Sequence, residues 1–129
     1  MANSDNVLRG GLTSKHIDVK ELIENVRFED TLPLVVQANR SRPHQEVYLT
    51  EAPDFELSQI ELASGESILL QASSVEMFLV MDGQVDVQPE GQRTWENSRG
   101  QAFVCFAGAA LTLVAKKQSR IFRAVVPLK

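Results

Sequence analysis

Residues 77–87 read Met77-Phe-Leu-Val-Met-Asp-Gly-Gln-Val-Asp-Val87, two short apolar runs joined by an Asp-Gly pair. Asp-Gly favours a two-residue hairpin, because a type I′ turn needs positive φ at both central residues. Every residue from 77 to 81 is apolar, so we expect both faces of that strand to be covered. A second sheet would cover one face, and a partner subunit or a helix the other. The stretch therefore predicts an antiparallel hairpin within a layered β structure.

The chain keeps this organisation from residue 46 to its end. Short apolar runs alternate with turn residues at intervals of about 8 to 12, which is typical of all-β sandwiches and barrels. We expect strands near residues 46–50, 54–63, 67–71, 75–81, 84–88, 92–96, 101–106, 110–115 and 120–126. The expected core contains Leu57, Ile60, Leu69, Phe78, Val80, Val85, Phe103, Val104, Leu113 and Val125.

Glycine spacing favours an all-β double-stranded β-helix, the jelly roll of the cupins, for these strands. The first cupin motif is similar to G-x5-H-x-H-x3,4-E-x6-G. Counting from Gly65 places Gln71 and Ser73 at the two histidines, Glu76 near the glutamate and Gly83 at the last glycine. The turns of this motif persist, whereas its histidines are replaced.

The second cupin motif, G-x5-P-x-G-x2-H, shows the same loss. Gly100 and Gly108 fall on its glycines, but Phe106 and Leu111 stand at the proline and the histidine. A metal site of this kind needs about three converging donors, and Glu76 alone cannot provide them. We therefore expect no metal or other cofactor in this chain.

Other reactive side chains have structural interpretations. Glu76 is expected to be a partly exposed carboxylate at a strand end rather than a general base. His16 and His44 lie outside the strand region without spaced ligand partners, so both are expected to be structural or solvated. Cys105 sits in the apolar run Ala102-Phe-Val-Cys-Phe-Ala107, which predicts a buried thiol.

Composition limits the classes of partner. The 129 residues carry a net charge of −4, which argues against nucleic acid or an anionic membrane as a partner. The basic residues Lys116, Lys117, Arg120 and Arg123 are expected to be solvated strand ends. With one cysteine, no apolar run of 18 residues and a polar start, we expect a cytoplasmic protein without signal peptide or membrane span.

The region before the strands predicts a short helix and an extended arm. Asp18 suits an N-cap with Glu21 three residues later, and the apolar positions 19, 22, 23 and 26 form one stripe on a helix over 19–27. We expect this helix to pack outside a sheet. Pro33 and Pro43 then indicate an irregular connection with one short extended piece. The expected organisation is residues 1–44 as loop, helix and arm, and residues 45–129 as jelly roll, in a single compact unit.

The opening residues 5–19 read Asp5-Asn-Val-Leu-Arg-Gly-Gly-Leu-Thr-Ser-Lys-His-Ile-Asp-Val19. Arg9 and Lys15 flank paired glycines in a polar segment, and an arginine fork suits carboxylate or phosphate. This segment resembles the D-N-V-x-R-[AG]-G-L-T-P-K-x-x-D-[VI] stretch that opens the C-terminal domain of type I mannose-6-phosphate isomerases. Its departure from that pattern is Ser14 in place of proline.

The resemblance implies a function. Members of that family interconvert mannose 6-phosphate and fructose 6-phosphate through an enediol, and their zinc ligands lie in an N-terminal cupin half that no segment of this chain resembles. By this likeness Arg9 is the expected catalytic cation, Lys15 a second contact to the sugar phosphate, and Asp5 a partner that orients Arg9. The chain alone is expected to be inactive.

An alternative from another class stays open at this point. The chain could be a stand-alone, metal-free cupin-like module for sugar binding or dimerisation. The expected partners are a sugar phosphate, an N-terminal zinc-bearing half and a second copy of the chain, since the apolar strand 75–81 favours a homodimer.

Overall fold

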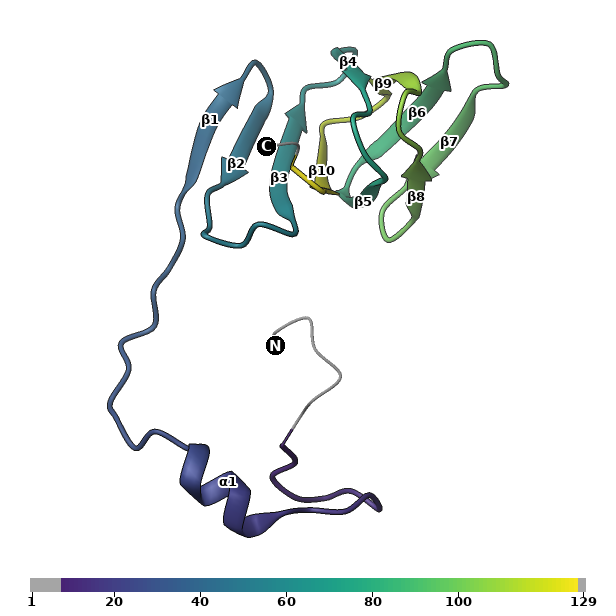
Figure 1. The fold of residues 1–129 in the computed structure, drawn as a ribbon. Coiled ribbons are helices and arrows are strands. Elements are labelled where there is room, and N and C mark those ends of the chain that lie inside the picture. The colour runs from purple at the N-terminus through teal and green to yellow at the C-terminus, as the bar shows by residue number, and fades with distance from the viewer. Residues whose placement is uncertain (1–7, 128–129) are drawn as a thin grey trace. The chain divides into compact units, whose positions relative to one another are not determined.

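The computed structural model describes residues 8–127 of the chain. They fall into two compact units, which divide between Leu34 and Val35. Figure 1 shows the elements of both units.

The N-terminal unit contains the helix α1 (Val19–Asn25). Asp18 caps it as expected, because the Asp18 Oδ1 atom accepts a hydrogen bond from the Glu21 backbone N–H at 3.0 Å. The Glu21 carboxylate accepts from Asn25 Nδ2 at 3.1 Å. None of the residues of α1 is buried, and Val19 and Ile23 are 58% and 59% exposed. The packing of this helix against a sheet stays a prediction.

The second unit is a two-layered jelly roll. Its strands are β1 (Ala38–Arg42), β2 (Gln45–Tyr48), β3 (Glu56–Leu62), β4 (Ser67–Gln71), β5 (Glu76–Asp82), β6 (Gln84–Pro89), β7 (Trp95–Ser98), β8 (Ala102–Cys105), β9 (Ala110–Ala115) and β10 (Ser119–Val125). One sheet has the order β1-β2-β3-β10-β5-β8 and the other β4-β9-β6-β7 (Figure 1). All their pairings are antiparallel, which confirms the predicted all-β fold class.

The Asp82-Gly83 pair does not form the predicted hairpin. It lies at a corner where the chain leaves one sheet for the other, because β5 belongs to the six-stranded sheet and β6 to the four-stranded sheet. Only Gly83 of the pair has positive φ, at 85°, whereas a type I′ turn requires it at both residues. A Cβ atom on Gly83 would lie 2.3 Å from the Gln118 carbonyl oxygen. Because Gly83 has no Cβ atom, the chain can pass close to the Gln118 backbone where it crosses from one sheet to the other.

The expected strands are otherwise present with small shifts. The strand expected at 92–96 is β7, from Trp95 to Ser98. The region expected as an irregular arm contains β1, which pairs with β2 in antiparallel register. β1 has the polar sequence Ala-Asn-Arg-Ser-Arg and shows no alternation of apolar residues, so periodicity had no signal there.

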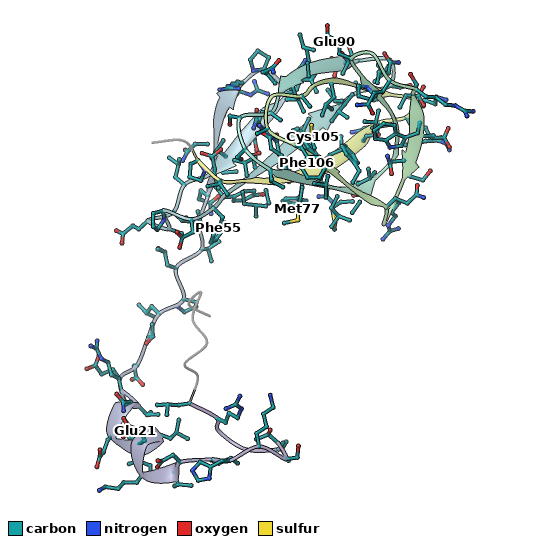
Figure 2. The ribbon with its side chains drawn as sticks, turned by 45° about the vertical axis from the view of Figure 1, so that its right-hand side comes forward. Glu21, Phe55, Met77, Glu90, Cys105 and Phe106 are labelled. Carbon is teal, nitrogen blue, oxygen red and sulfur yellow. The ribbon has the colours of Figure 1, made fainter. Side chains whose placement is uncertain are left out.

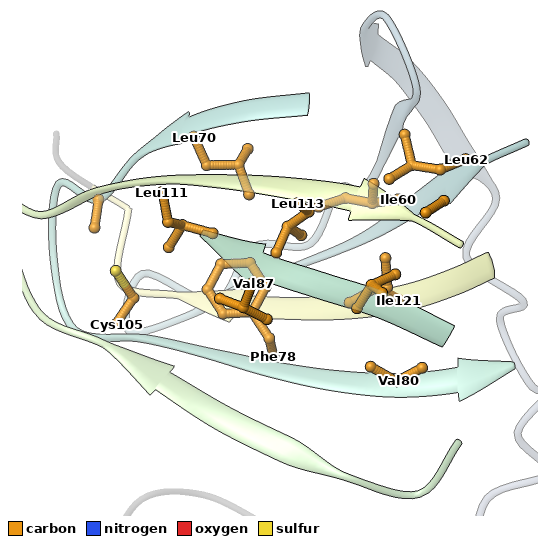
Figure 3. Packing of buried hydrophobic residues seen from close by; sticks show 13 residues of the cluster. Ile60, Leu62, Leu70, Phe78, Val80, Val87, Cys105, Leu111, Leu113 and Ile121 are labelled. Carbon is orange, nitrogen blue, oxygen red and sulfur yellow. The ribbon is translucent and has the colours of Figure 1, made fainter. Parts of the chain in front are cut away.

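The core lies between the two sheets. Figure 3 shows Phe78, Val80, Val87, Leu111, Leu113 and Ile121 meeting from both layers. Ile60, Phe78, Val80, Val85, Leu113 and Val125 are buried as predicted. Leu57 lies on the outer face of β3, so placing it in the core was wrong. Leu69 and Val104 are 73% and 50% exposed, so placing them in the core was wrong as well. Their neighbours Leu70 and Cys105 point inward instead, since one residue of shift exchanges the two faces of a strand.

The outer face of the six-stranded sheet is apolar along one row of paired residues. Tyr48 is opposite Leu57, Leu57 opposite Ala124, Ala124 opposite Met77 and Met77 opposite Val104. Met77 is 58% exposed and projects from the sheet in Figure 2. We call this row of five residues the outer apolar row. That a helix or a partner subunit covers this face stays a prediction.

Candidate functional site

The loop that carries Arg9 has no regular structure over residues 8–18. Gly11 and Leu12 have positive φ, at 134° and 51°. Leu12 is fully exposed, so side-chain packing does not explain this backbone conformation, which non-glycine residues seldom adopt. The paired glycines have open space around their Cα atoms, with no heavy atom within 4 Å of a Cβ built on either. A ligand group could approach the backbone closely there.

The two cations of this loop differ in exposure. Arg9 is half-buried and Lys15 is exposed, and the Lys15 backbone N–H donates to Thr13 Oγ1 at 3.2 Å. Asp5, the expected partner of Arg9, lies outside the described residues. The roles of Arg9, Lys15 and Asp5 stay predictions.

A buried ion pair lies inside the jelly roll. Glu76 on β5 is 0% exposed and Arg123 on β10 is 7% exposed. Arg123 donates from Nε to Glu76 Oε2 at 2.7 Å and from Nη2 to Glu76 Oε1 at 2.6 Å. Reading Glu76 as a partly exposed carboxylate and Arg123 as a solvated strand end was therefore wrong. The two residues are 47 positions apart in the chain, so no local sequence pattern could predict their contact.

Cys105 lies beside this pair, opposite Glu76 in the register of β5 and β8. It is buried, as predicted. Burial raises the pKa of its thiol, and the Glu76 carboxylate raises that pKa further while Arg123 opposes the shift. A thiol with a raised pKa is a poor nucleophile at neutral pH.

The positions that correspond to cupin metal ligands do not form a metal site. Gln71 Nε2 donates to the Gly108 carbonyl oxygen at 3.0 Å, and Leu111 is buried among apolar residues. Both Glu76 oxygens already accept from Arg123, and Oε1 also accepts from the Ser73 backbone N–H at 3.2 Å. Within residues 8–127 no three His, Cys, Asp or Glu side chains converge to hold a metal. The described residues therefore do not suit zinc.

Two open clefts border the jelly-roll unit. One, of about 550 Å³, is lined by Arg42, Gln45, Glu56, Ser73 and Arg123 among others. The other, of about 610 Å³, includes His44, whose Nδ1 lies 3.5 Å from Glu66 Oε2. Both are lined by charged and polar side chains from several strands.

Comparison with known proteins relates most of the chain to one enzyme family. No protein-family model matches the sequence. The mannose-6-phosphate isomerase of Salmonella typhimurium is 36% identical over 81% of this chain. Mannose-6-phosphate isomerase 1 of Arabidopsis thaliana is 29% identical over 96% of it, and the enzyme of Rattus norvegicus 34% over the same share. The chain is a homologue of the mannose-6-phosphate isomerases.

Solved structures agree with this relationship. A mutant of phosphomannose isomerase from Salmonella typhimurium superposes with a TM-score of 0.80, at 26% identity, over 98% of this chain and 33% of that one. An RmlC-like cupin from Shewanella frigidimarina, at 11% identity and a TM-score of 0.60 over 73% of this chain, supports the cupin fold alone. The resemblance to the isomerase family and the cupin-like jelly roll are both confirmed.

The homology covers part of each relative. The chain spans 27% of the Salmonella mannose-6-phosphate isomerase and 29% of the Arabidopsis isomerase 1. The part of the chain that the structure describes includes no helix with the length and apolar character needed to cross a membrane.

Proposed function

We propose that this chain is the C-terminal cupin domain of a mannose-6-phosphate isomerase and supplies Arg9 and Lys15 to its active site. The observation that carries this proposal is the extent of the similarity. The match to the Arabidopsis isomerase covers 96% of the chain, and the match to the Salmonella structure covers 98%. Both matches therefore include the Arg9 loop as well as the jelly roll.

The proposed reaction converts mannose 6-phosphate to fructose 6-phosphate in the metabolism of carbohydrates. An aldose–ketose isomerase moves a proton between neighbouring carbons through an enediol, on which negative charge develops. Arg9 would hold phosphate or enediolate oxygens through its planar fork, and Lys15 would add a second positive contact. Asp5 would orient Arg9 by a charge-assisted hydrogen bond. Zinc, with its ligands, would belong to the N-terminal half of the enzyme.

The outer apolar row supports the proposed partners. A row of neighbouring apolar side chains on the surface marks an interaction site more often than isolated exposed residues do. The N-terminal half of the enzyme and a second copy of this chain are the proposed partners for this surface. We propose a homodimer for the chain by itself and a cytoplasmic location, in which Cys105 stays reduced.

A second candidate function is a metal-free sugar-binding or dimerisation module that acts without an isomerase half. The cleft lined by polar side chains of β1, β2, β3 and β10 favours it, because it could hold a ligand without any metal. The two functions differ in whether the chain joined to a zinc-bearing N-terminal half is an active isomerase.

A coupled fructose 6-phosphate assay tests the first function. The chain alone should show no turnover above background, whereas the chain joined to a zinc-bearing N-terminal half should be active. In that complete enzyme Arg9→Ala should lower kcat/KM about 100-fold or more, the scale of losing one preorganised charge contact. Arg9→Lys should recover activity only partly, because the charge remains while the fork is lost.

The other substitutions refine the assignment. Lys15→Ala should act mainly by raising KM if the side chain holds phosphate. Lys20→Ala on the exposed helix α1 is the matched control and should leave both constants unchanged. Turnover by the chain alone would overturn the two-half account. Unchanged kinetics of the Arg9→Ala enzyme would remove Arg9 from the active site. No turnover by the chain joined to the zinc-bearing half would favour the module.

A further inference from the structure

The cleft of about 550 Å³ opens at one end of the jelly roll, on the inner side of the six-stranded sheet. All of its lining residues belong to the unit Val35–Lys129. Its polar groups come from four neighbouring strands of the six-stranded sheet, from the end of β4 and from the segment after it. They are Arg42 on β1, Gln45 on β2, Glu56 at the start of β3, Gln71 at the end of β4, Ser73, and Arg123 on β10.

Gln45 is the unusual member of this lining, since it is 3% exposed and only half of its amide is paired. Gln45 Nε2 donates to Ser58 Oγ at 3.0 Å, and Ser58 Oγ donates to the Arg123 carbonyl oxygen at 3.5 Å. A hydroxyl has a single proton, and with that proton directed at the Arg123 carbonyl oxygen Ser58 Oγ accepts from Gln45 Nε2, so Oε1 lies on the other side of the amide. Among the described residues no donor reaches the buried Gln45 Oε1 atom. A buried acceptor without a donor is unfavourable and calls for a partner.

Arg123 leaves donors available on the same side of the sheet. Its Nε and Nη2 atoms bind Glu76, and none of the hydrogen bonds between described residues uses Nη1, which carries two N–H groups. Glu76 neutralises the charge of Arg123 without using these donors. The cleft thus combines donors on Arg123 and Arg42 with acceptors on Gln45 and Glu56.

The formal charges around the cleft cancel, with Arg42 and Arg123 against Glu56 and Glu76. A hydroxyl group both donates and accepts, so a molecule with several hydroxyls can satisfy both kinds of lining atom. An inorganic anion would mainly accept, and it would face the lone pairs of Gln45 and the carboxylate of Glu56. The lining therefore favours a neutral polyol over an anion.

We propose that this cleft binds a small polyhydroxylated molecule of about monosaccharide size, with hydroxyls that donate to Gln45 Oε1 and accept from Arg123 and Arg42. Because Oε1 is covered in the unliganded protein, binding includes a small shift of the Gln45 side chain toward the cleft. This site is independent of the Arg9 loop and of the proposed isomerase activity and needs no metal; it rests on the second candidate function, for which it names the ligand class and the contacting residues.

Amide NMR titration of the full chain tests the proposal. D-mannitol, D-glucose and myo-inositol are the neutral probes, and inorganic phosphate is the anionic probe. At least one polyol should shift amides of β1, β2 and β10 with a Kd on the order of millimolar, which is usual for small neutral ligands. Phosphate should leave these amides unchanged. A response to phosphate alone, or to none of the four probes, would overturn the proposal.

Variants then locate the site. Gln45→Leu removes the unpaired acceptor at similar volume and should weaken polyol binding at least tenfold while leaving the thermal midpoint unchanged or raised. Gln92→Leu, in the exposed turn after β6, is the matched control and should bind as the original chain does. Should Gln45→Leu fail to fold, Arg42→Gln on the exposed edge strand replaces it and should also weaken binding. Unchanged polyol binding by the folded variant would contradict the assignment of the site to this cleft.

Discussion

Arg123 on β10 donates two hydrogen bonds to the carboxylate of Glu76 on β5, from Nε to Oε2 at 2.7 Å and from Nη2 to Oε1 at 2.6 Å. Both side chains are buried inside the jelly roll. Counting from Gly65 puts Glu76 near the carboxylate position of the cupin metal motif, and here both of its oxygens accept hydrogen bonds from a guanidinium. An arginine fork matches a carboxylate in charge and in planar geometry. The Arg123 guanidinium therefore neutralises the buried charge of Glu76 in a jelly roll that has no histidines at the metal-ligand positions.

Breaking this pair should strongly destabilise the fold. Arg123→Met leaves the Glu76 charge buried and unpaired, which we expect to lower the free energy of unfolding by roughly 3–5 kcal/mol. Adding Glu76→Gln to Arg123→Met should recover part of that loss. Urea unfolding measures both variants. The exposed Arg120, which pairs with Asp82, supplies the control Arg120→Met with a loss of about 1 kcal/mol or less. Equal losses for the two arginines would contradict the burial of the Glu76 pair.

Gly83 should tolerate substitution poorly. Gly83→Ala puts a Cβ atom 2.3 Å from the Gln118 carbonyl oxygen at a residue with φ of 85°. Gly91 has φ of 69° but open space around it, so Gly91→Ala carries the conformational strain without the clash. We expect a loss of about 1 kcal/mol for Gly91→Ala and at least twice that for Gly83→Ala. Thermal unfolding compares the two, and similar midpoints would show that the crossing between sheets is not crowded.

The Cys105 thiol should be unreactive in the native protein. Burial and Glu76 raise its pKa, so little thiolate forms at pH 8, and iodoacetamide should modify it at least ten times more slowly than in the denatured chain. With the native pKa raised, the stability from the protonated thiol is complete below the unfolded-state pKa. It is lost as pH rises through the native pKa. Cys105→Ala should therefore reduce the loss of stability at alkaline pH, and fast native alkylation would contradict this account.

The isolated chain should retain no transition metal. Coordination by Glu76 would require Arg123 to leave it, and no histidine lies at the aligned positions 71, 73 and 111. Elemental analysis after dialysis against chelator, and again after zinc is added and excess removed, should find far less than one metal per chain. Near-stoichiometric zinc would refute this prediction.

The outer apolar row should mediate self-association. Light scattering at tens of micromolar should give a dimer mass for the chain, and Met77→Glu should shift it to a monomer because a charge would be buried in the contact. Leu69 lies on the outer face of the other sheet and is 73% exposed, so Leu69→Glu is the matched control and should stay dimeric. A monomer mass for the original chain would count against the homodimer.

The sequence alone determined the features that depend on neighbouring residues. Alternating apolar residues located most strands, glycine spacing indicated the jelly roll, and Asp18 marked the start of α1 because its N-cap bond spans three residues. The long motif from Asp5 to Val19 identified the isomerase family, which the comparisons confirmed. The roles of Arg9 and Lys15 come from that motif and stay predictions.

Tertiary structure alone decided the features that depend on strand order and register. Asp82-Gly83 has the composition of a hairpin turn, yet it crosses between layers because β5 pairs with β10 and β8 while β6 pairs with β9 and β7. Leu69 and Leu70 are equally apolar, and only the register of β4 on β9 turns the second inward. Glu76 and Arg123 meet across 47 positions, because β10 lies beside β5 in the folded sheet and brings the two charges together inside it. Such contacts are set by the packing of whole strands, which no local pattern of residues specifies.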